Sequence, residues 1–278
     1  TTRRQRQMCI RDRNDSRQAD FGTMSNSRGS EITAVWRFFH QLGSPKPFYD
    51  LSGRFLPWVG TLSVLILAVG LGWGLLFAPA DYQQGHSVRI MYIHVPAAIV
   101  AQSSYVLMAV CALVSLIWRM KLADVAFTTL APIGAVITAL ALVTGAIWGK
   151  PTWGTYWVWD ARLTSTLILF LLFTGVVSLR KMGPDTVQGG KAAALLAVVG
   201  VINLPIIKYS VDWWFTLHQP ASFSLTERPA MPVEMWAPLL VALIGTYCWM
   251  SWLWLLRMRV EVLKRESRSA WAQEALTE

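Results

Sequence analysis

The sequence predicts an all-α polytopic membrane protein whose chain crosses the bilayer six times. Of its 278 residues, 54% are hydrophobic and only 15% are charged, and the mean hydropathy is +0.41. A soluble domain of ordinary composition carries more charge. Six apolar runs account for this composition, and each approaches the roughly 20 residues that a helix needs to cross a bilayer.

The six apolar runs cover residues 57–78, 95–118, 125–148, 163–179, 192–207 and 236–256. The fifth run is short, but Lys191 and Lys208 flank it, and their long side chains can reach the headgroups from inside the membrane. Pro205 predicts a kink in this span. We therefore expect six transmembrane helices that alternate in direction.

The distribution of basic residues predicts the orientation. Of the 25 Lys and Arg residues, 20 lie in the two terminal tails and in the connections near 119–121 and 180–191. The other five lie in the connections at about 79–94, 149–162 and 208–235. Because cytoplasmic loops are enriched in Lys and Arg, both termini are expected in the cytoplasm and these three loops on the outer face. The net charge of +9 then reflects topology, and the compact six-span form favours a bacterial inner membrane.

The regions that flank the spans divide the chain. Residues 1–30 are polar and Arg-rich, and we expect a disordered or artefactual tail with Met24 as the true start. Residues 31–56 predict an amphipathic segment at the membrane interface, because apolar side chains recur there at helical spacing. Residues 57–256 form the membrane domain, with an aromatic loop at 149–165, and residues 257–278 form a cytoplasmic tail.

The second outer loop carries the densest group of aromatic residues, namely Trp153, Tyr156, Trp157 and Trp159, next to Asp160 and Arg162. If this loop is helical, Trp153 and Trp157 share one face, as do Tyr156 and Asp160. An interfacial aromatic belt is the alternative explanation, since Trp and Tyr favour the headgroup level. A belt scatters its rings over every interface, however, so this crowding favours a large flat ligand that stacks on the indoles.

Two histidines lie in the other outer loops, His94 at the start of the second span and His218 after an aromatic stretch. A lone histidine is more often a satisfied polar residue than a ligand, but these two lie on one side, beside the aromatic loop. A flat apolar ligand whose centre accepts two imidazoles is haem. Arg89 and Arg162, with Lys150 in reserve, are candidates to pair with its propionates, and Asp160 is expected to orient Arg162 or an imidazole.

Other chemistry is poorly supported by the sequence. It contains no phosphate-binding loop, no HExxH or GxSxG motif and no pair of carboxylates within the spans. We therefore expect a binding and transfer protein without catalytic residues, not an enzyme. A b-type haem electron-transfer subunit, a small-molecule permease and a scaffold with an adhesive outer face stay open as alternatives.

The segment WGTYWVWDARLTS, residues 153–165, resembles the tryptophan-rich signature of the WWD-domain haem-handling family, and within it the haem exporter protein C (CcmC) family. The segments RIMYIHVPAA, residues 89–98, and VDWWFTLHQP, residues 211–220, resemble the same family. The resemblance implies that His94 and His218 are the axial ligands of a non-covalently bound b-type haem. It also implies that Arg89 is functionally important and that the platform under the porphyrin consists of Trp153, Trp157, Trp159, Asp160 and Arg162.

The same resemblance implies a role in the biogenesis of c-type cytochromes. Such a protein holds haem at the periplasmic membrane surface and delivers it to the haem chaperone CcmE. Further partners implied by the family are the small helper CcmD and the ATP-binding cassette transporter formed by CcmA and CcmB.

Overall fold

The computed structural model describes residues 43–182, 187–218 and 231–277, and this part of the chain is helical apart from its connections. Its elements are α2 (Pro45–Gly72), η1 (Trp73–Phe77), η2 (His86–Ile90), α3 (Met91–Trp118), α4 (Lys121–Trp153), α5 (Ala161–Met182), α6 (Val187–Val199), η3 (Gly200–Ile202), α7 (Asn203–Trp213), α8 (Val233–Arg265) and α9 (Ala270–Thr277). The contacts described below lie within Tyr49–Glu278, which forms one compact unit.

Six helical segments are long and apolar enough to cross a membrane, as the sequence predicts: Pro45–Phe77, His86–Trp118, Lys121–Trp153, Ala161–Met182, Gly189–Trp213 and Val233–Arg265. They are longer than the apolar runs because helical structure continues into polar residues beyond the hydrocarbon core. The first therefore begins at Pro45 instead of residue 57, inside the stretch expected to lie at the interface. The tail 1–30 and the amphipathic stretch around 31–42 lie outside the described residues.

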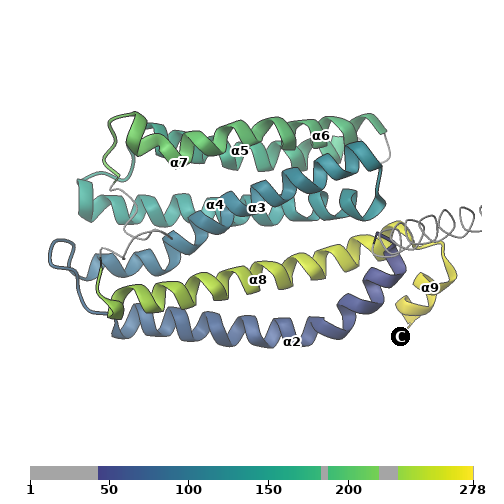
Figure 1. Cartoon of the computed structure of the whole chain (residues 1–278), viewed down its shortest axis with the longest axis horizontal. Coiled ribbons are helices and arrows are strands. Elements are labelled where there is room, and N and C mark those ends of the chain that lie inside the picture. Colours follow the sequence, from purple (N-terminus) through teal and green to yellow (C-terminus); the bar gives the residue numbers. More distant parts are fainter. Residues whose placement is uncertain (1–42, 183–186, 219–230, 278) are drawn as a thin grey trace, which may run out of the picture. The chain divides into compact units, whose positions relative to one another are not determined.

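Successive spans run in opposite directions, and α3 and α4 occupy the centre of the bundle (Figure 1). α3 packs against α4, α6 and α8, whereas α4 packs against α5 and α8. The core between these helices is closed by fully buried Tyr105 and Phe173, whose rings meet edge to face at 4.9 Å. A Cβ at Gly134 would lie 2.2 Å from Phe173 Cε1, so the glycine makes room for this ring.

Small residues join the first span to the last. A Cβ at Gly70 would lie 2.5 Å from the backbone nitrogen of Ala242, and one at Gly245 would lie 2.7 Å from the Cα of Leu67. The absence of side chains lets the α2 and α8 backbones approach closely, as is common between helices in membranes. α2 and α8 therefore lie along each other over much of their length (Figure 1).

The fifth span is broken near the predicted kink. α6 ends at Val199, the three residues of η3 tighten into a 3-10 turn, and α7 begins at Asn203, shortly before Pro205. Such a change of helix type relieves the steric conflict that proline creates one turn earlier. Buried Asn203 donates a hydrogen bond of 2.8 Å to the carbonyl of Ser165, which ties α7 to α5.

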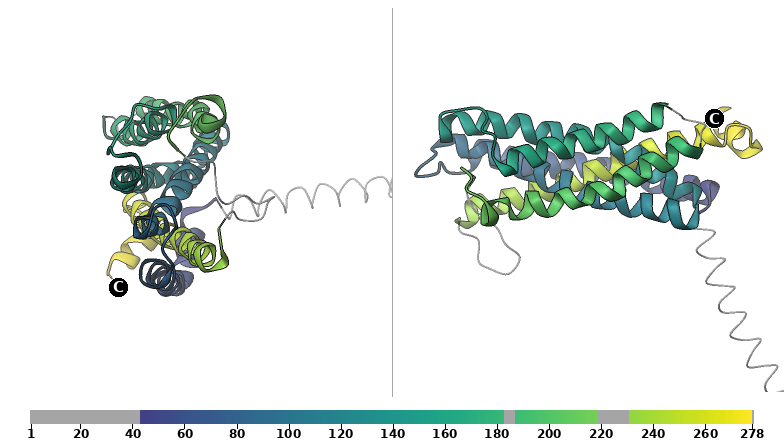
Figure 2. Two further views of the ribbon diagram at one scale, coloured as in Figure 1. Left: turned by 90° about the vertical axis from the view of Figure 1, so that its left-hand side faces the viewer. Right: turned by 90° about the horizontal axis from the view of Figure 1, so that it is seen from above.

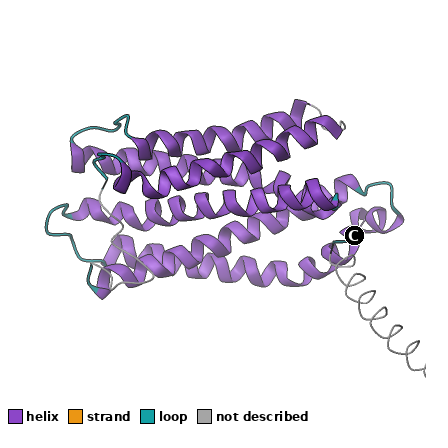
Figure 3. Ribbon diagram, turned by 45° about the horizontal axis from the view of Figure 1, so that its top comes forward, coloured by secondary structure: helices purple, strands orange, loops and turns teal. Residues whose placement is uncertain are grey.

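The connections 78–85 and 154–160 and the described ends of the third outer loop lie at one end of the bundle (Figures 2 and 3). The second of these connections is not helical, so the condition for shared helix faces in the aromatic loop is not met. α4 ends at Trp153, Gly154 adopts a left-handed conformation with φ of 78°, and α5 starts after Asp160. Glycine takes this conformation without the steric cost of a Cβ. Trp153 and Trp157 therefore do not share a helix face, and neither do Tyr156 and Asp160.

Candidate functional site

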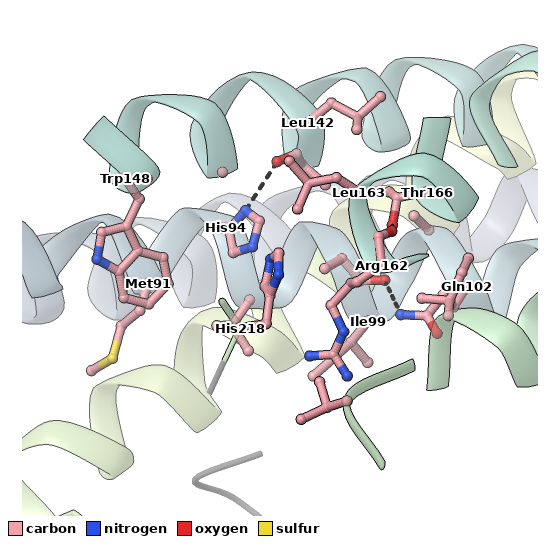
Figure 4. Close-up of a pocket in the computed structure, with 18 of the residues that line it drawn as sticks. Met91, His94, Ile99, Gln102, Leu142, Trp148, Arg162, Leu163, Thr166 and His218 are labelled. Atoms are coloured by element: carbon pink, nitrogen blue, oxygen red, sulfur yellow. Dashed lines mark hydrogen bonds between the residues drawn. The ribbon is translucent and has the colours of Figure 1, made fainter. Parts of the chain in front are cut away.

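A cavity of about 600 Å³ opens at the end of the bundle that carries these connections (Figure 4). This volume is in the usual range for sites that bind small molecules and cofactors, roughly 300–1,000 Å³. Its walls come from α3, α4, α5, α7 and α8 and are largely apolar. The polar groups that line it include His94, Arg162, Lys208 and His218. Five of the nine sequence-predicted site residues thus line one cavity: His94, Trp153, Trp157, Arg162 and His218.

His94 lies in the first turn of α3, and contacts from α4 fix its ring. Its Nδ1 is 3.0 Å from the carbonyl oxygen of Ala141 and 3.2 Å from Oγ1 of Thr144. A carbonyl oxygen only accepts hydrogen bonds, so Nδ1 carries the proton and Nε2 keeps a free lone pair. A Cβ at Gly145 would lie 2.8 Å from His94 Cε1, so this glycine provides the space for the imidazole.

His218 follows α7, and a carboxylate fixes its ring. Its Nδ1 is 3.2 Å from Oδ2 of Asp160, and its ring contacts that of Trp153 edge to face at 4.6 Å. Burial lowers the pKa of His218, and the nearby carboxylate of Asp160 opposes this effect only in part. The imidazole is therefore neutral at neutral pH, with its proton on Nδ1 and its lone pair on Nε2. Of the two partners expected for Asp160, Arg162 and an imidazole, it is the imidazole that donates a hydrogen bond to its carboxylate.

The two imidazoles point toward each other inside the cavity, from different elements (Figure 4). Histidines that bind metals typically donate their second N–H to a carbonyl or a carboxylate, and both rings have such a partner. Within the described residues, no group of three or more His, Cys, Asp or Glu side chains could hold a metal ion by itself. The two imidazoles could supply two nitrogen ligands to a metal.

The aromatic loop divides into cavity-lining and outer residues. Trp153 and Trp157 line the cavity, and the buried Nε1 of Trp157 has no hydrogen-bond acceptor within the described part of the chain. An oxygen of a bound ligand could accept this N–H. Trp159 is 77% exposed and contacts Trp157 edge to face, whereas Tyr156 is 58% exposed and lies under the ammonium group of Lys150. Neither Trp159 nor Tyr156 lines the cavity.

The two predicted arginines have different surroundings. Arg162 lines the cavity, and its Nε donates to Oγ of Ser210 at 3.1 Å, which holds the guanidinium beside α7. Arg89 donates to the carbonyls of Leu75 and Ala78 at 3.0 and 2.8 Å, and it does not line the cavity. Arg89 therefore satisfies backbone carbonyls at the end of the first span, and of the two arginines it is Arg162 that lines the cavity.

Sequence reasoning missed the residues that position His94. Trp148 contacts the imidazole edge to face, and its Nε1 donates to Oε1 of Gln84 at 2.9 Å. Oγ1 of Thr144 accepts a hydrogen bond from Nδ1 of His94, and Gly145 leaves the space that the imidazole occupies. All three lie on α4 just before the aromatic loop, and their role depends on how α4 packs against α3, which the sequence pattern does not show.

Comparisons with known proteins identify the family of this chain. The model of the family described as heme exporter protein C matches residues 38–273, which include every candidate site residue. The chain is 47% identical over 239 residues to heme exporter protein C of Haemophilus influenzae, which covers 86% of this chain and 97% of the relative. It is 48% identical over 242 residues to heme exporter protein C of Escherichia coli K12, covering 87% and 98%, and 48% identical over 234 residues to that of Bradyrhizobium diazoefficiens, covering 84% and 89%.

Proposed function

The chain belongs to the heme exporter protein C family, and we propose that it binds haem at the periplasmic surface of the inner membrane and delivers it during the biogenesis of c-type cytochromes. One observation carries this proposal. Two imidazoles point into a single cavity, and each engages Nδ1 with the protein and leaves Nε2 as the ligand atom. These two imidazoles would hold the iron of a non-covalently bound b-type haem.

Haem would supply an iron that takes axial nitrogen ligands and a flat apolar ring with two carboxylates. In this proposal His94 and His218 hold the iron, and Trp153 and Trp157 contact the ring. Arg162 pairs with a propionate through charge-assisted hydrogen bonds, and the Trp157 N–H provides a further donor. The apolar wall excludes water from the iron ligands and strengthens these interactions.

The surroundings of the cavity suit delivery as well as binding. Trp159 and Tyr156 are exposed beside the cavity-lining tryptophans, so they offer an aromatic surface to a protein that receives the haem. We propose the chaperone CcmE as this receiver, with CcmD as a helper. The sequence has no phosphate-binding loop, so ATP hydrolysis is assigned to the CcmA and CcmB transporter and no enzymatic activity to this chain.

The proposed setting is the bacterial inner membrane, with both termini in the cytoplasm and the cavity on the periplasmic side. The 20 basic residues at the opposite end and in the tails support this orientation. An electron-transfer subunit is less well supported, because His218 lies after α7 and not within a span, so two helices do not supply opposed ligands.

The test is the visible spectrum of the purified protein. We expect a low-spin haem spectrum from the wild type and loss of that spectrum in His94→Ala and in His218→Ala. Added imidazole should restore the six-coordinate spectrum in each variant, because it replaces the missing ligand. Unchanged spectra and haem content in both variants would falsify axial ligation by these residues.

A further inference from the structure

The cavity continues well below the imidazoles. Its wall on α3 extends from His94 to Gln102, eight residues or about 12 Å along the helix. On α8 it extends from Trp236 to Leu243, about 10 Å. Gln102 stands at the middle of the span His86–Trp118. The lower part of the cavity is therefore at the depth of the lipid tails.

At this depth the cavity reaches the outer surface of the bundle. Ile99 on α3 and Leu240 on α8 both line the cavity, yet they are 38% and 37% exposed. Ile99 is also the first residue of an exposed apolar stripe on α3 that continues through Val106, Val110, Leu113 and Ile117. An aliphatic stripe on a spanning helix faces lipid. The same side chain thus borders both the cavity and the bilayer.

The packing of the helices explains this opening. α7 packs on α5, and α8 packs on α3 and α4, but α7 and α8 share no substantial packing within the described residues. They lie apart on either side of α3 in Figure 1 and in the end-on view of Figure 2. α3 therefore forms the floor of a gap whose two edges are α7 and α8.

The cavity changes in polarity from this gap to the imidazoles. Apolar side chains, including Ala98, Ile99, Leu169, Leu240 and Leu243, dominate the lower part, where the polar residues are the uncharged Gln102 and Thr166. The charged residues Arg162, Lys208 and Asp212 and the two imidazoles line the part nearer the outer end of the bundle. A planar amphiphile dissolved in a bilayer places its ring among the tails and its carboxylates at the headgroups. The cavity has the same order of environments, mostly apolar at the depth of the lipid tails and charged nearer the headgroups.

We propose that the cavity has a lateral mouth between α7 and α8, bordered by Ile99 and Leu240, through which haem dissolved in the outer leaflet enters the site. This inference rests on the proposed function for the identity of the ligand. It adds a route, because the ring slides from lipid to the imidazoles without passing through water, where it is poorly soluble.

The first experiment measures the rate of haem loading. The apoprotein in lipid nanodiscs is mixed with vesicles that contain haem, and absorbance follows the formation of the low-spin species. Ile99→Trp and Leu240→Trp narrow the mouth, whereas Val106→Trp and Ile244→Trp add the same bulk to exposed positions on α3 and α8 that do not line the cavity.

We expect the two mouth variants to load about tenfold more slowly, with the final haem content and band positions unchanged. The two control variants should load within about twofold of the wild type. Equal rates in all four variants overturn the lateral route. If the wild type binds no haem that depends on His94 and His218, the proposed function fails, and the route for haem fails with it.

The second experiment needs no haem and tests the opening itself. A bimane fluorophore is attached to Ile99→Cys in a variant whose native residues Cys9, Cys111 and Cys248 are replaced by alanine, and the apoprotein is studied in nanodiscs. Lipids with a quencher in the acyl chain should quench this label as strongly as a label at Val106→Cys, and aqueous iodide should quench it weakly. Dominant quenching by iodide overturns the mouth, because the cavity would then open to water alone.

Discussion

Asp160 Oδ2 lies 3.2 Å from His218 Nδ1, while Oδ1 of the same carboxylate accepts the backbone N–H of Leu163 at 2.8 Å. One carboxylate thus caps the first turn of α5 and orients an imidazole that comes from the segment after α7. Capping a helix and orienting a metal ligand both require a hydrogen-bond acceptor in a fixed position. Asp160 meets this requirement because it lies at the rigid start of α5.

The first prediction separates these two roles with Asp160→Asn. The asparagine oxygen can still accept the Leu163 N–H, so the melting temperature should change little. Its amide group, however, donates toward His218 and favours the tautomer whose proton is on Nε2, which removes the ligand lone pair. We expect haem affinity, measured by optical titration, to fall about 10- to 100-fold.

Asp160→Ala is the comparison for this prediction. It should weaken haem binding as well, and it should also destabilise the protein by about 1 kcal/mol because the cap is lost. Wild-type affinity in Asp160→Asn would contradict the role of the carboxylate in setting the tautomer.

The second prediction concerns the space beside His94. In Gly145→Ala the new Cβ would lie 2.8 Å from Cε1 of an imidazole that two hydrogen bonds hold in place. The ring must move, so haem affinity should fall at least tenfold, although alanine favours the helix by about 1 kcal/mol over glycine. The control is Gly72→Ala, where the added methyl group meets no atom within 4 Å and affinity should be unchanged. Equal affinity in both variants would show that the glycine does not set the ring position.

The sequence predicted the number and location of the spans because length and hydrophobicity decide whether a segment crosses a bilayer. It did not predict where the helices end, since helix ends such as Pro45 and Arg265 lie beyond the hydrocarbon core, where polarity no longer distinguishes helix from loop. The sequence left the conformation of the aromatic loop open for a similar reason. Gly154 interrupts the helical spacing through its backbone conformation, which a helical reading of the pattern overlooks.

The sequence identified the site residues that lie close together in the aromatic loop. It did not identify the residues whose role depends on packing between helices. The aromatic loop singled out Trp153 and Trp157, and both line the cavity. The separate surroundings of Arg89 and Arg162 follow from which carbonyls and hydroxyls lie within reach of each guanidinium, and this depends on how η1 packs against η2 and α5 against α7. Thr144 and Gly145 on α4 contact His94 on α3, and a contact between two helices cannot be predicted from the pattern of either segment alone.

The third prediction distinguishes the two arginines. Arg162→Gln should weaken binding of haem about tenfold, because a propionate loses a charge-assisted hydrogen bond. Binding of haem dimethyl ester, which lacks both carboxylates, should be the same in this variant and the wild type. Arg89→Gln should instead lower the melting temperature, since two backbone carbonyls lose their donor, and leave the affinity for both ligands unchanged. A weaker interaction of the ester with Arg162→Gln would argue against propionate pairing.

The fourth prediction concerns the opposite end of the bundle, where Asp124 joins three helices. Its Oδ2 is 2.7 Å from Nη2 of Arg180 on α5 and 2.6 Å from Nη1 of Arg265 on α8. All three side chains are at least two-thirds buried, so in Asp124→Asn the guanidinium of Arg180 loses its carboxylate partner and that of Arg265 keeps only Glu261, at 2.7 Å. We expect a lower melting temperature, equivalent to roughly 1–3 kcal/mol of stability.

The matched control is Lys121→Gln, which removes an ion pair of 3.3 Å with Glu266 whose lysine is 76% exposed. Exposed pairs contribute little, so the melting temperature of this variant should stay close to that of the wild type. Haem affinity should be unchanged in both variants, because Asp124 lies about 25 Å along α4 from Ala141, the residue that holds His94. Weaker haem binding by Asp124→Asn at an unchanged melting temperature would mean that the two ends of the bundle are coupled through α4. Haem binding would then depend on residues at both ends of the bundle.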